Sequence, residues 1–161
     1  PLTTVNGKVI HRDWDYLQYF INEARRLGLK VTVSTAMFPS GHPATREGLV
    51  YDESRWDGKT CLEYTPDGKM LDIREDKKKV GAFLNPVRKD VRKFALSIVR
   101  EIVRNYDVDA YALDYCRYPG DDSDFSADSR KAFEHYLGKK VRNFPDDIFT
   151  WNADGTKNPG I

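Results

Sequence analysis

The sequence predicts a parallel α/β fold, and three observations lead to this prediction. Residues 108–113 form a short apolar run that is typical of a buried strand. A helical pattern precedes this run (88–106) and another follows it (126–137), which is the repeat order of parallel sheets. Asp114 and Arg117 stand where the strand ends, and ligands of such folds bind at the carboxyl ends of strands. We therefore predict a chemical role for Asp114 and a structural one for Asp109, at the opposite end.

The amino-terminal part predicts a turn, a helix and a strand. Asn6-Gly7 is a typical hairpin turn within an otherwise irregular start. Asp13 is the predicted N-cap of a helix that ends at Gly28. Residues 30–36 alternate and are β-branched, which predicts a strand. The apolar positions of the helix repeat at helical spacing: Trp14, Leu17, Ile21, Ala24 and Leu27.

Residues 38–84 leave the regular pattern and are predicted to form a long loop inserted in a single domain that spans residues 1–161. Pro66-Asp67-Gly68 predicts a β-hairpin between residues 61–65 and 69–73. The charge run 74–79 is expected to be a solvated face. A loop of this length is often functional. It follows the carboxyl end of a strand, so we expect it to overhang the face that carries Asp114.

Residues 85–161 are predicted to form two helices, an acidic loop and a turn-rich end. Asn85 and Pro86 are the predicted cap and first residue of the helix over 88–106, whose basic row is expected to face solvent. Asp121, Asp122 and Asp124 offer oxygen ligands for Ca²⁺, but acids before a helix that Ser126 caps are the favoured interpretation. No cofactor is therefore predicted. Residues 139–161 are rich in turn formers, with a surface turn at 152–156 and no further strand expected.

Composition excludes several classes of protein. The formal net charge is +1, whereas nucleic-acid binding needs a surplus of clustered cations. No apolar run approaches the ~20 residues of a membrane span. The two cysteines, Cys61 and Cys116, match no metal motif and are predicted to be free thiols. Trp56 and Trp151 lie in segments that do not resemble a core, where aromatic rings can stack on sugars, whereas Trp14 is expected to anchor its helix.

The length limits the architecture. A closed (β/α)8 barrel needs roughly 200–250 residues. Two strand–helix units and a leading helix supply about half of one. From the residues alone, the chain is either a portion of such a barrel, with a long βα loop carrying a β-hairpin, or a smaller α/β sandwich.

The residues after the second strand suit carbohydrate chemistry. Glycoside hydrolysis uses two carboxylates, one as nucleophile or base and one as general acid. Asp114 suits the first role, because a cation such as Arg117 within ~4–6 Å favours an ionised carboxylate. Tyr115 and Tyr118 are placed to stack on a sugar or bond its hydroxyls, and His42 to bind a hydroxyl. The alternatives are a structural salt bridge between Asp114 and Arg117, and a loop histidine without a role.

The second carboxylate is not identified by the sequence. Several acids of the long loop are candidates, and loop position alone selects none of them: Glu47, Asp52, Glu53, Asp57 and Glu63.

Three segments carry a family resemblance: Asn85-Pro86, residues 98–109 and residues 113–119. They resemble the bacterial glycoside-hydrolase-like family 10, distant relatives of the α-amylase barrels, and residues 23–35 and 126–151 fit the same group. The resemblance implies a (β/α)8 barrel, a glycan substrate and a secreted, periplasmic or cell-surface location. It places Asp114 at the nucleophile position of the fourth strand and adds Asn85 to the substrate-binding candidates.

The resemblance also implies that the general acid lies on the next strand, beyond Ile161. Many relatives carry two adjacent acids at this strand end, whereas Leu113 and Tyr115 flank Asp114 here. Two functions are therefore predicted in order. The first is a glycoside hydrolase, and the alternative is a non-catalytic carbohydrate-binding barrel.

Overall fold

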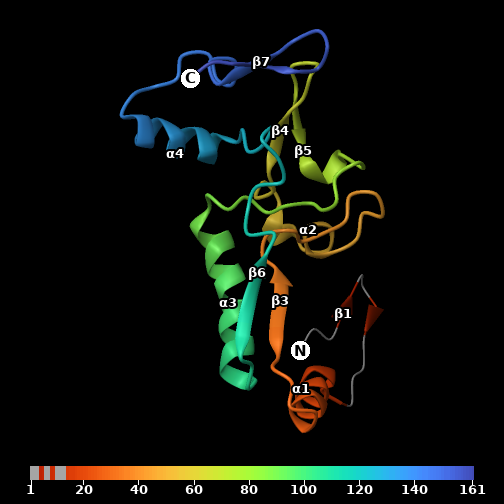
Figure 1. The fold of residues 1–161 in the computed structure, drawn as a ribbon. Coiled ribbons are helices and arrows are strands. Elements are labelled where there is room, and N and C mark those ends of the chain that lie inside the picture. The colour runs from red at the N-terminus through yellow and green to blue at the C-terminus, as the bar shows by residue number, and fades with distance from the viewer. Residues whose placement is uncertain (1–3, 6–7, 10–13) are drawn as a thin grey trace.

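The computed structural model describes residues 4–5, 8–9 and 14–161 (Figure 1). Its helices are α1 (Tyr16–Arg26), α2 (Leu49–Asp52), α3 (Lys89–Asn105) and α4 (Ala127–Leu137), with 3-10 turns at Ser54–Trp56 and Ile73–Glu75. Its strands are β1 (Thr4–Val5), β2 (Lys8–Val9), β3 (Thr32–Ala36), β4 (Leu62–Tyr64), β5 (Met70–Asp72), β6 (Ala110–Asp114), β7 (Phe149–Trp151) and β8 (Lys157–Pro159). These strands form four two-stranded sheets, and β3–β6 is the parallel one.

The β3–β6 pair is the parallel unit that the sequence predicts. Its register runs from Thr32 opposite Ala110 to Ala36 opposite Asp114, so both strands end together. In Figure 1 the long α3 is aligned with the two strands, and α1 lies at their amino end. The mixed helix and strand content agrees with a partial α/β domain.

Asp109 has the structural role predicted for it. Its carboxylate accepts a hydrogen bond from the Val31 amide (2.7 Å) and lies 2.6 Å from the Arg25 guanidinium. These contacts join the start of β3, the loop before β6 and helix α1. The Val31 amide, together with Arg25, holds the pKa of Asp109 below its usual range.

We expect Asp109→Ala to lower the Tm by several degrees, because it leaves the Val31 amide and Arg25 without their common acceptor. Thermal unfolding followed by circular dichroism measures the effect. Activity per folded molecule should not change, since Asp109 stands at the end of β6 away from Asp114. A loss of activity with an unchanged Tm would reverse the assigned roles.

Helix α1 is capped by a different residue from the predicted one. Asp15 is the N-cap, and its side chain accepts from the Gln18 amide at 3.0 Å. The predicted cap Asp13 and the predicted turn at Asn6-Gly7 lie outside the described residues. Strands β1 and β2 pair antiparallel. Gly28, with φ of +70°, follows the helix as predicted.

The apolar stripe of α1 is narrower than its periodicity predicts. Ile21 and Ala24 are buried against Val31, whereas Trp14 is 59% and Leu27 62% exposed. Trp14 precedes the helix and contacts only the edge of the Tyr19 ring among the ring pairs described (5.7 Å). The prediction that Trp14 anchors the helix face is therefore wrong.

Helix α3 begins at Lys89, with Arg88 as N-cap, so the predicted cap at Asn85 is also wrong. The Asn85 side-chain oxygen accepts from the Val87 amide two residues on (3.0 Å), which forms a local turn. Arg88 then donates its amide to the Asn85 carbonyl at 3.2 Å. The chain therefore turns through Pro86 before the helix starts.

The predicted long loop builds most of the main core. It contains the predicted hairpin β4–β5, and it adds helix α2. Trp56 is buried there, and its ring centre lies 4.7 Å from that of Phe94 with the two planes tilted by 56°, so its predicted exposure is wrong. Cys61 is a buried free thiol and Cys116 an exposed one, as predicted. The core cluster consists of Met37, Phe38, Val50, Trp56, Cys61, Ile73, Ala82, Phe83, Leu84, Val91 and Ala95.

The carboxyl-terminal part confirms one prediction and corrects another. Ser126 caps α4 and accepts from the Ser129 amide, as predicted. Residues 149–159, expected to lack strands, form the β7–β8 hairpin around the predicted turn. The Trp151 indole N–H donates to the Tyr64 carbonyl (3.1 Å), which ties this hairpin to β4. Within the described chain, no helix is long and apolar enough to cross a bilayer.

Candidate functional site

Asp114 is the last residue of β6 and its side chain is exposed. Its Oδ1 atom accepts from the Tyr115 amide at 2.8 Å, which fixes the carboxylate and leaves Oδ2 without a protein donor among the described residues. Its main-chain oxygen accepts from the Met37 amide (2.8 Å), just past the end of β3. The two parallel strands are thus joined where the carboxylate emerges.

Asp114 stands at the end of an open sheet face. Side chains alternate across a strand, and partners in register share a face. The face that carries Asp114 is otherwise made of small side chains, all of them exposed: Thr32, Ser34, Ala36, Ala110 and Ala112. The opposite face carries Val33, which packs on the α1 cluster, and Tyr111, whose hydroxyl lies 2.5 Å from the Thr35 hydroxyl. Leu113 lies on this opposite face and is 52% exposed, so that face is only partly covered, whereas every side chain on the face of Asp114 is exposed.

Arg117 does not accompany Asp114 as predicted. Its guanidinium lies 5.1 Å from the centre of the Tyr115 ring and donates to the carbonyls of Tyr118 (3.0 Å) and Pro119 (3.3 Å). In the described part of the chain Asp114 forms no ion pair. Tyr115 has a left-handed backbone (φ +45°), and its ring packs edge-on against Phe83 at 5.9 Å. The turn after β6 therefore directs the guanidinium onto the loop itself.

His42 is exposed in a tight turn of the long segment. Its amide donates to the Glu47 carbonyl, and its carbonyl accepts from the Arg46 amide, both at 2.8 Å. No hydrogen bond or ion pair in the described chain joins His42 to Asp114. The contacts of the described chain therefore do not place this histidine beside Asp114.

Asn85 is buried, with 1% of its surface exposed. Its amide nitrogen donates to Asp124 Oδ2 (2.5 Å) and to the Ser126 hydroxyl (3.0 Å). Because its side-chain oxygen is also occupied by the Val87 amide, Asn85 is committed to contacts within the protein. The structure therefore places it as a support for the loop between β6 and α4, instead of among exposed binding groups.

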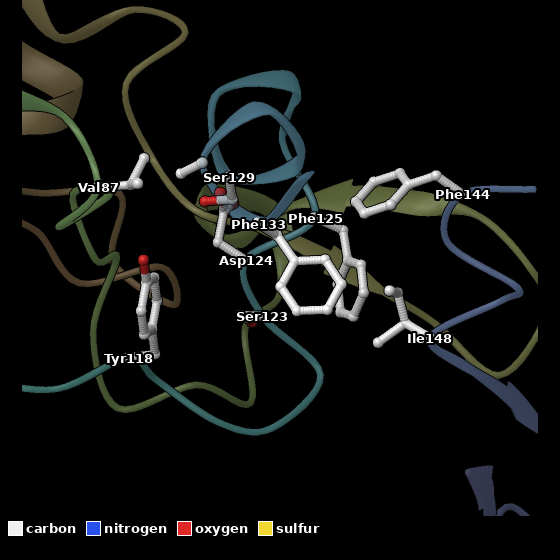
Figure 2. Close-up of a pocket in the computed structure, with 10 residues that line it drawn as sticks. Val87, Tyr118, Ser123, Asp124, Phe125, Ser129, Phe133, Phe144 and Ile148 are labelled. Atoms are coloured by element: carbon white, nitrogen blue, oxygen red, sulfur yellow. The ribbon is translucent and has the colours of Figure 1, made fainter. Parts of the chain in front are cut away.

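Tyr118, four residues after Asp114, lines a pocket of about 320 Å³. Figure 2 shows Tyr118 on one side of it, the rings of Phe125, Phe133 and Phe144 on the other, and Asp124 between them. Burial raises the pKa of Tyr118, and a hydrogen bond with Ser129 opposes the shift. A phenol is protonated at neutral pH in any case, so this hydroxyl is able to donate. The pocket was not predicted. The sequence signal for it is a set of phenylalanines before, within and after the helix at 126–137: Phe125, Phe133 and Phe144.

The acidic run before α4 is divided among separate partners. Asp121 pairs with Lys157, Asp122 with Lys79, and Asp124 accepts from Asn85 and from the Leu62 amide (2.5 Å). Among the described residues, no three acidic, histidine or cysteine side chains form a group that could hold a metal ion.

Glu63 is the one buried carboxylate of the five candidate acids named in the long loop, with 2% of its surface exposed. It lies 2.6 Å from the Lys79 ammonium, which is also 3.1 Å from Asp122. Burial raises the pKa of Glu63, although Lys79 opposes the shift. The expectation of a fully solvated charge run at 74–79 is wrong for Lys79, because this ion triad joins the long segment to the β6–α4 loop.

Comparison with known proteins identifies the family of this chain. The chain is 36% identical over 150 residues to an S-layer-related protein of Niallia circulans, a match that covers 91% of this chain and 9% of that protein. The chain therefore spans about a tenth of the length of this relative. No solved structure matches it. Residues 4–158 match the family described as glycosyl hydrolase-like 10, which points to a carbohydrate-related function. The chain thus belongs to the glycosyl hydrolase-like 10 family.

Proposed function

We propose that this chain forms about half of a (β/α)8 barrel that hydrolyses glycosidic bonds of a poly- or oligosaccharide, with Asp114 as nucleophile or base. One observation carries the proposal: an exposed carboxylate ends a parallel strand on a sheet face whose side chains are all exposed. In barrels the helices cover the outside, and catalytic side chains stand at the carboxyl ends of the strands. Family membership supports the same chemistry.

In this function, Asp114 acts through the oxygen that the protein leaves free. The Tyr115 amide holds Oδ1, so Oδ2 faces the substrate, either to attack the anomeric carbon or to take a proton from water. A second carboxyl group, in its protonated form, must give a proton to the leaving oxygen. Glu63 is too deeply buried to reach a glycosidic bond, and no contact among the described residues joins another acid of the long segment to Asp114. We therefore propose that the acid comes from a later strand of the barrel.

The family relative suggests where the glycan is found. The Niallia circulans protein is named as S-layer-related, and we propose by analogy that this chain acts outside the cell or at its surface. Peptidoglycan strands and other surface polysaccharides are then the first substrates to test.

The test is the release of reducing ends by the intact protein across a glycan panel that includes peptidoglycan strands. Release from one glycan, lost in Asp114→Asn, would establish hydrolysis and its substrate class. Binding of a glycan without release from any member of the panel would instead favour the second function.

The second function is a non-catalytic carbohydrate-binding barrel. It is favoured by the single carboxylate at the end of β6 and by the aromatic groups of the loop that follows it, Tyr115 and Tyr118. This function predicts that Tyr115→Ala or Tyr118→Ala weakens glycan binding while no reducing ends are released.

A further inference from the structure

We propose that the pocket beside Tyr118 is a subsite for one neutral sugar ring of the glycan. This inference rests on the proposed carbohydrate function and deepens it. The pocket joins four parts of the chain: the turn before α3, the β6–α4 loop, helix α4 and the segment before β7 (Figure 2). Tyr118 links it along the chain to Asp114, because it lies four residues after that residue in the loop that follows β6.

The size and lining of the pocket fit a sugar ring. About 320 Å³ lies at the small end of known ligand sites, which suits a single ring of a longer chain. Phe125, Phe133 and Phe144 provide flat apolar surface, which matches the C–H face of a pyranose. The rings of Phe125 and Phe144 lie 5.7 Å apart at a tilt of 46°, so the aromatic wall is a packed unit.

Polar groups line the same pocket. The Tyr118 hydroxyl, which is hydrogen-bonded to the Ser129 hydroxyl, is able to donate to a ring oxygen or a hydroxyl of a sugar. Asp124 Oδ2 is fully used by Asn85 and Ser126, whereas Oδ1 accepts only the Leu62 amide. A carboxylate oxygen has two acceptor sites, so Oδ1 keeps one for a sugar hydroxyl. A sugar offers both an apolar face and hydroxyl groups, and this lining complements the two.

The charge of the lining selects neutral sugars. None of the residues that line the pocket is cationic, and Asp124 contributes a carboxylate. Arg130 lies over the Phe144 ring at 5.2 Å, but its guanidinium is engaged by Glu134 and by the Val141 carbonyl. A uronic acid or a phosphorylated sugar would place a second negative charge beside Asp124 without a counter-ion in the wall. The pocket therefore favours a hexose or an N-acetylhexosamine.

The test measures binding to the intact protein that carries Asp114→Asn, so that hydrolysis does not consume the probe. Calorimetry with neutral hexose oligomers and with N-acetylhexosamine oligomers gives the affinity, and a polygalacturonate oligomer serves as the anionic probe. Two substitutions act on the pocket. Phe133→Leu keeps apolar volume but removes the flat ring, and Tyr118→Phe removes one hydroxyl.

We expect each substitution to weaken binding of a neutral oligomer about tenfold, as loss of one ring stack or one hydrogen bond does. The matched control is Tyr136→Ala on the same helix, because Tyr136 is 85% exposed and does not line the pocket. Unchanged affinity in both pocket variants, or preference for the anionic oligomer, would overturn the subsite. Neither result depends on turnover, so failure of the hydrolase function leaves this test intact.

Discussion

Replacing Asp114 with asparagine is expected to lower kcat on the cognate glycan about 10³-fold or more, while the Tm stays the same. Asparagine keeps the size of the side chain and an oxygen that still accepts the Tyr115 amide. It removes the negative charge needed to attack the anomeric carbon or to take a proton from water, and loss of such a group costs orders of magnitude in rate. The Tm is unaffected because the side chain is exposed and forms no ion pair within the described chain.

The matched control is Asp107→Asn, the same chemical change in the loop that precedes β6. Asp107 is well exposed and lies 3.6 Å from Arg25, at the amino end of the strand. We expect this variant to retain full turnover. Initial rates of reducing-end release, measured at saturating glycan, compare the two variants. Retained turnover in Asp114→Asn would remove Asp114 from the reaction, whatever the control shows.

The parts of the fold that were predicted correctly depend on local signals. Strand β6 and the Ser126 cap follow from apolar runs and capping chemistry within a few residues. Asp109 was assigned correctly because a strand has two ends and only one of them carries ligands in parallel folds. Each of these inferences needs only the neighbouring sequence.

The parts that were missed depend on partners far away in the chain. Asn85 looks like a helix cap, yet Asp124, 39 residues later, engages its amide. Trp56 is buried because Phe94 lies across the core, and no periodicity in its own segment indicates this. Arg117 turned away from Asp114 because Tyr115 takes a left-handed backbone, which the sequence does not signal.

The second large effect that we expect is a loss of stability when the ion triad of Glu63, Lys79 and Asp122 is broken. We expect Lys79→Met to lower the free energy of unfolding by about 2–3 kcal/mol at pH 7, because it leaves the buried Glu63 carboxylate without its cation. This is somewhat less than the loss expected for a fully buried pair, since Lys79 remains partly exposed. Urea unfolding followed by fluorescence measures the change.

The loss of unfolding free energy caused by Lys79→Met should depend on pH. The direction of this dependence follows from the protonation of Glu63. Burial raises the pKa of Glu63 in the folded protein, so protonation of this group stabilises the fold at low pH and that contribution is lost as pH rises through the raised pKa. Without Lys79 the pKa rises further, because the cation that favours the charged form is gone. The destabilisation should therefore shrink between pH 7 and pH 5, as Glu63 takes up a proton.

Glu63→Gln separates the charge from the shape of the side chain. In the double variant with Lys79→Met, no buried charge is left at position 63, so we expect it to be more stable at pH 7 than Lys79→Met alone. Its stability should also lose the dependence between pH 5 and pH 7 that Glu63 provides. A Lys79→Met penalty that is the same at both pH values, and the same with glutamine at position 63, would show that Lys79 acts through Asp122 alone. In that case the long segment would be held to the β6–α4 loop by a surface contact instead of a buried one.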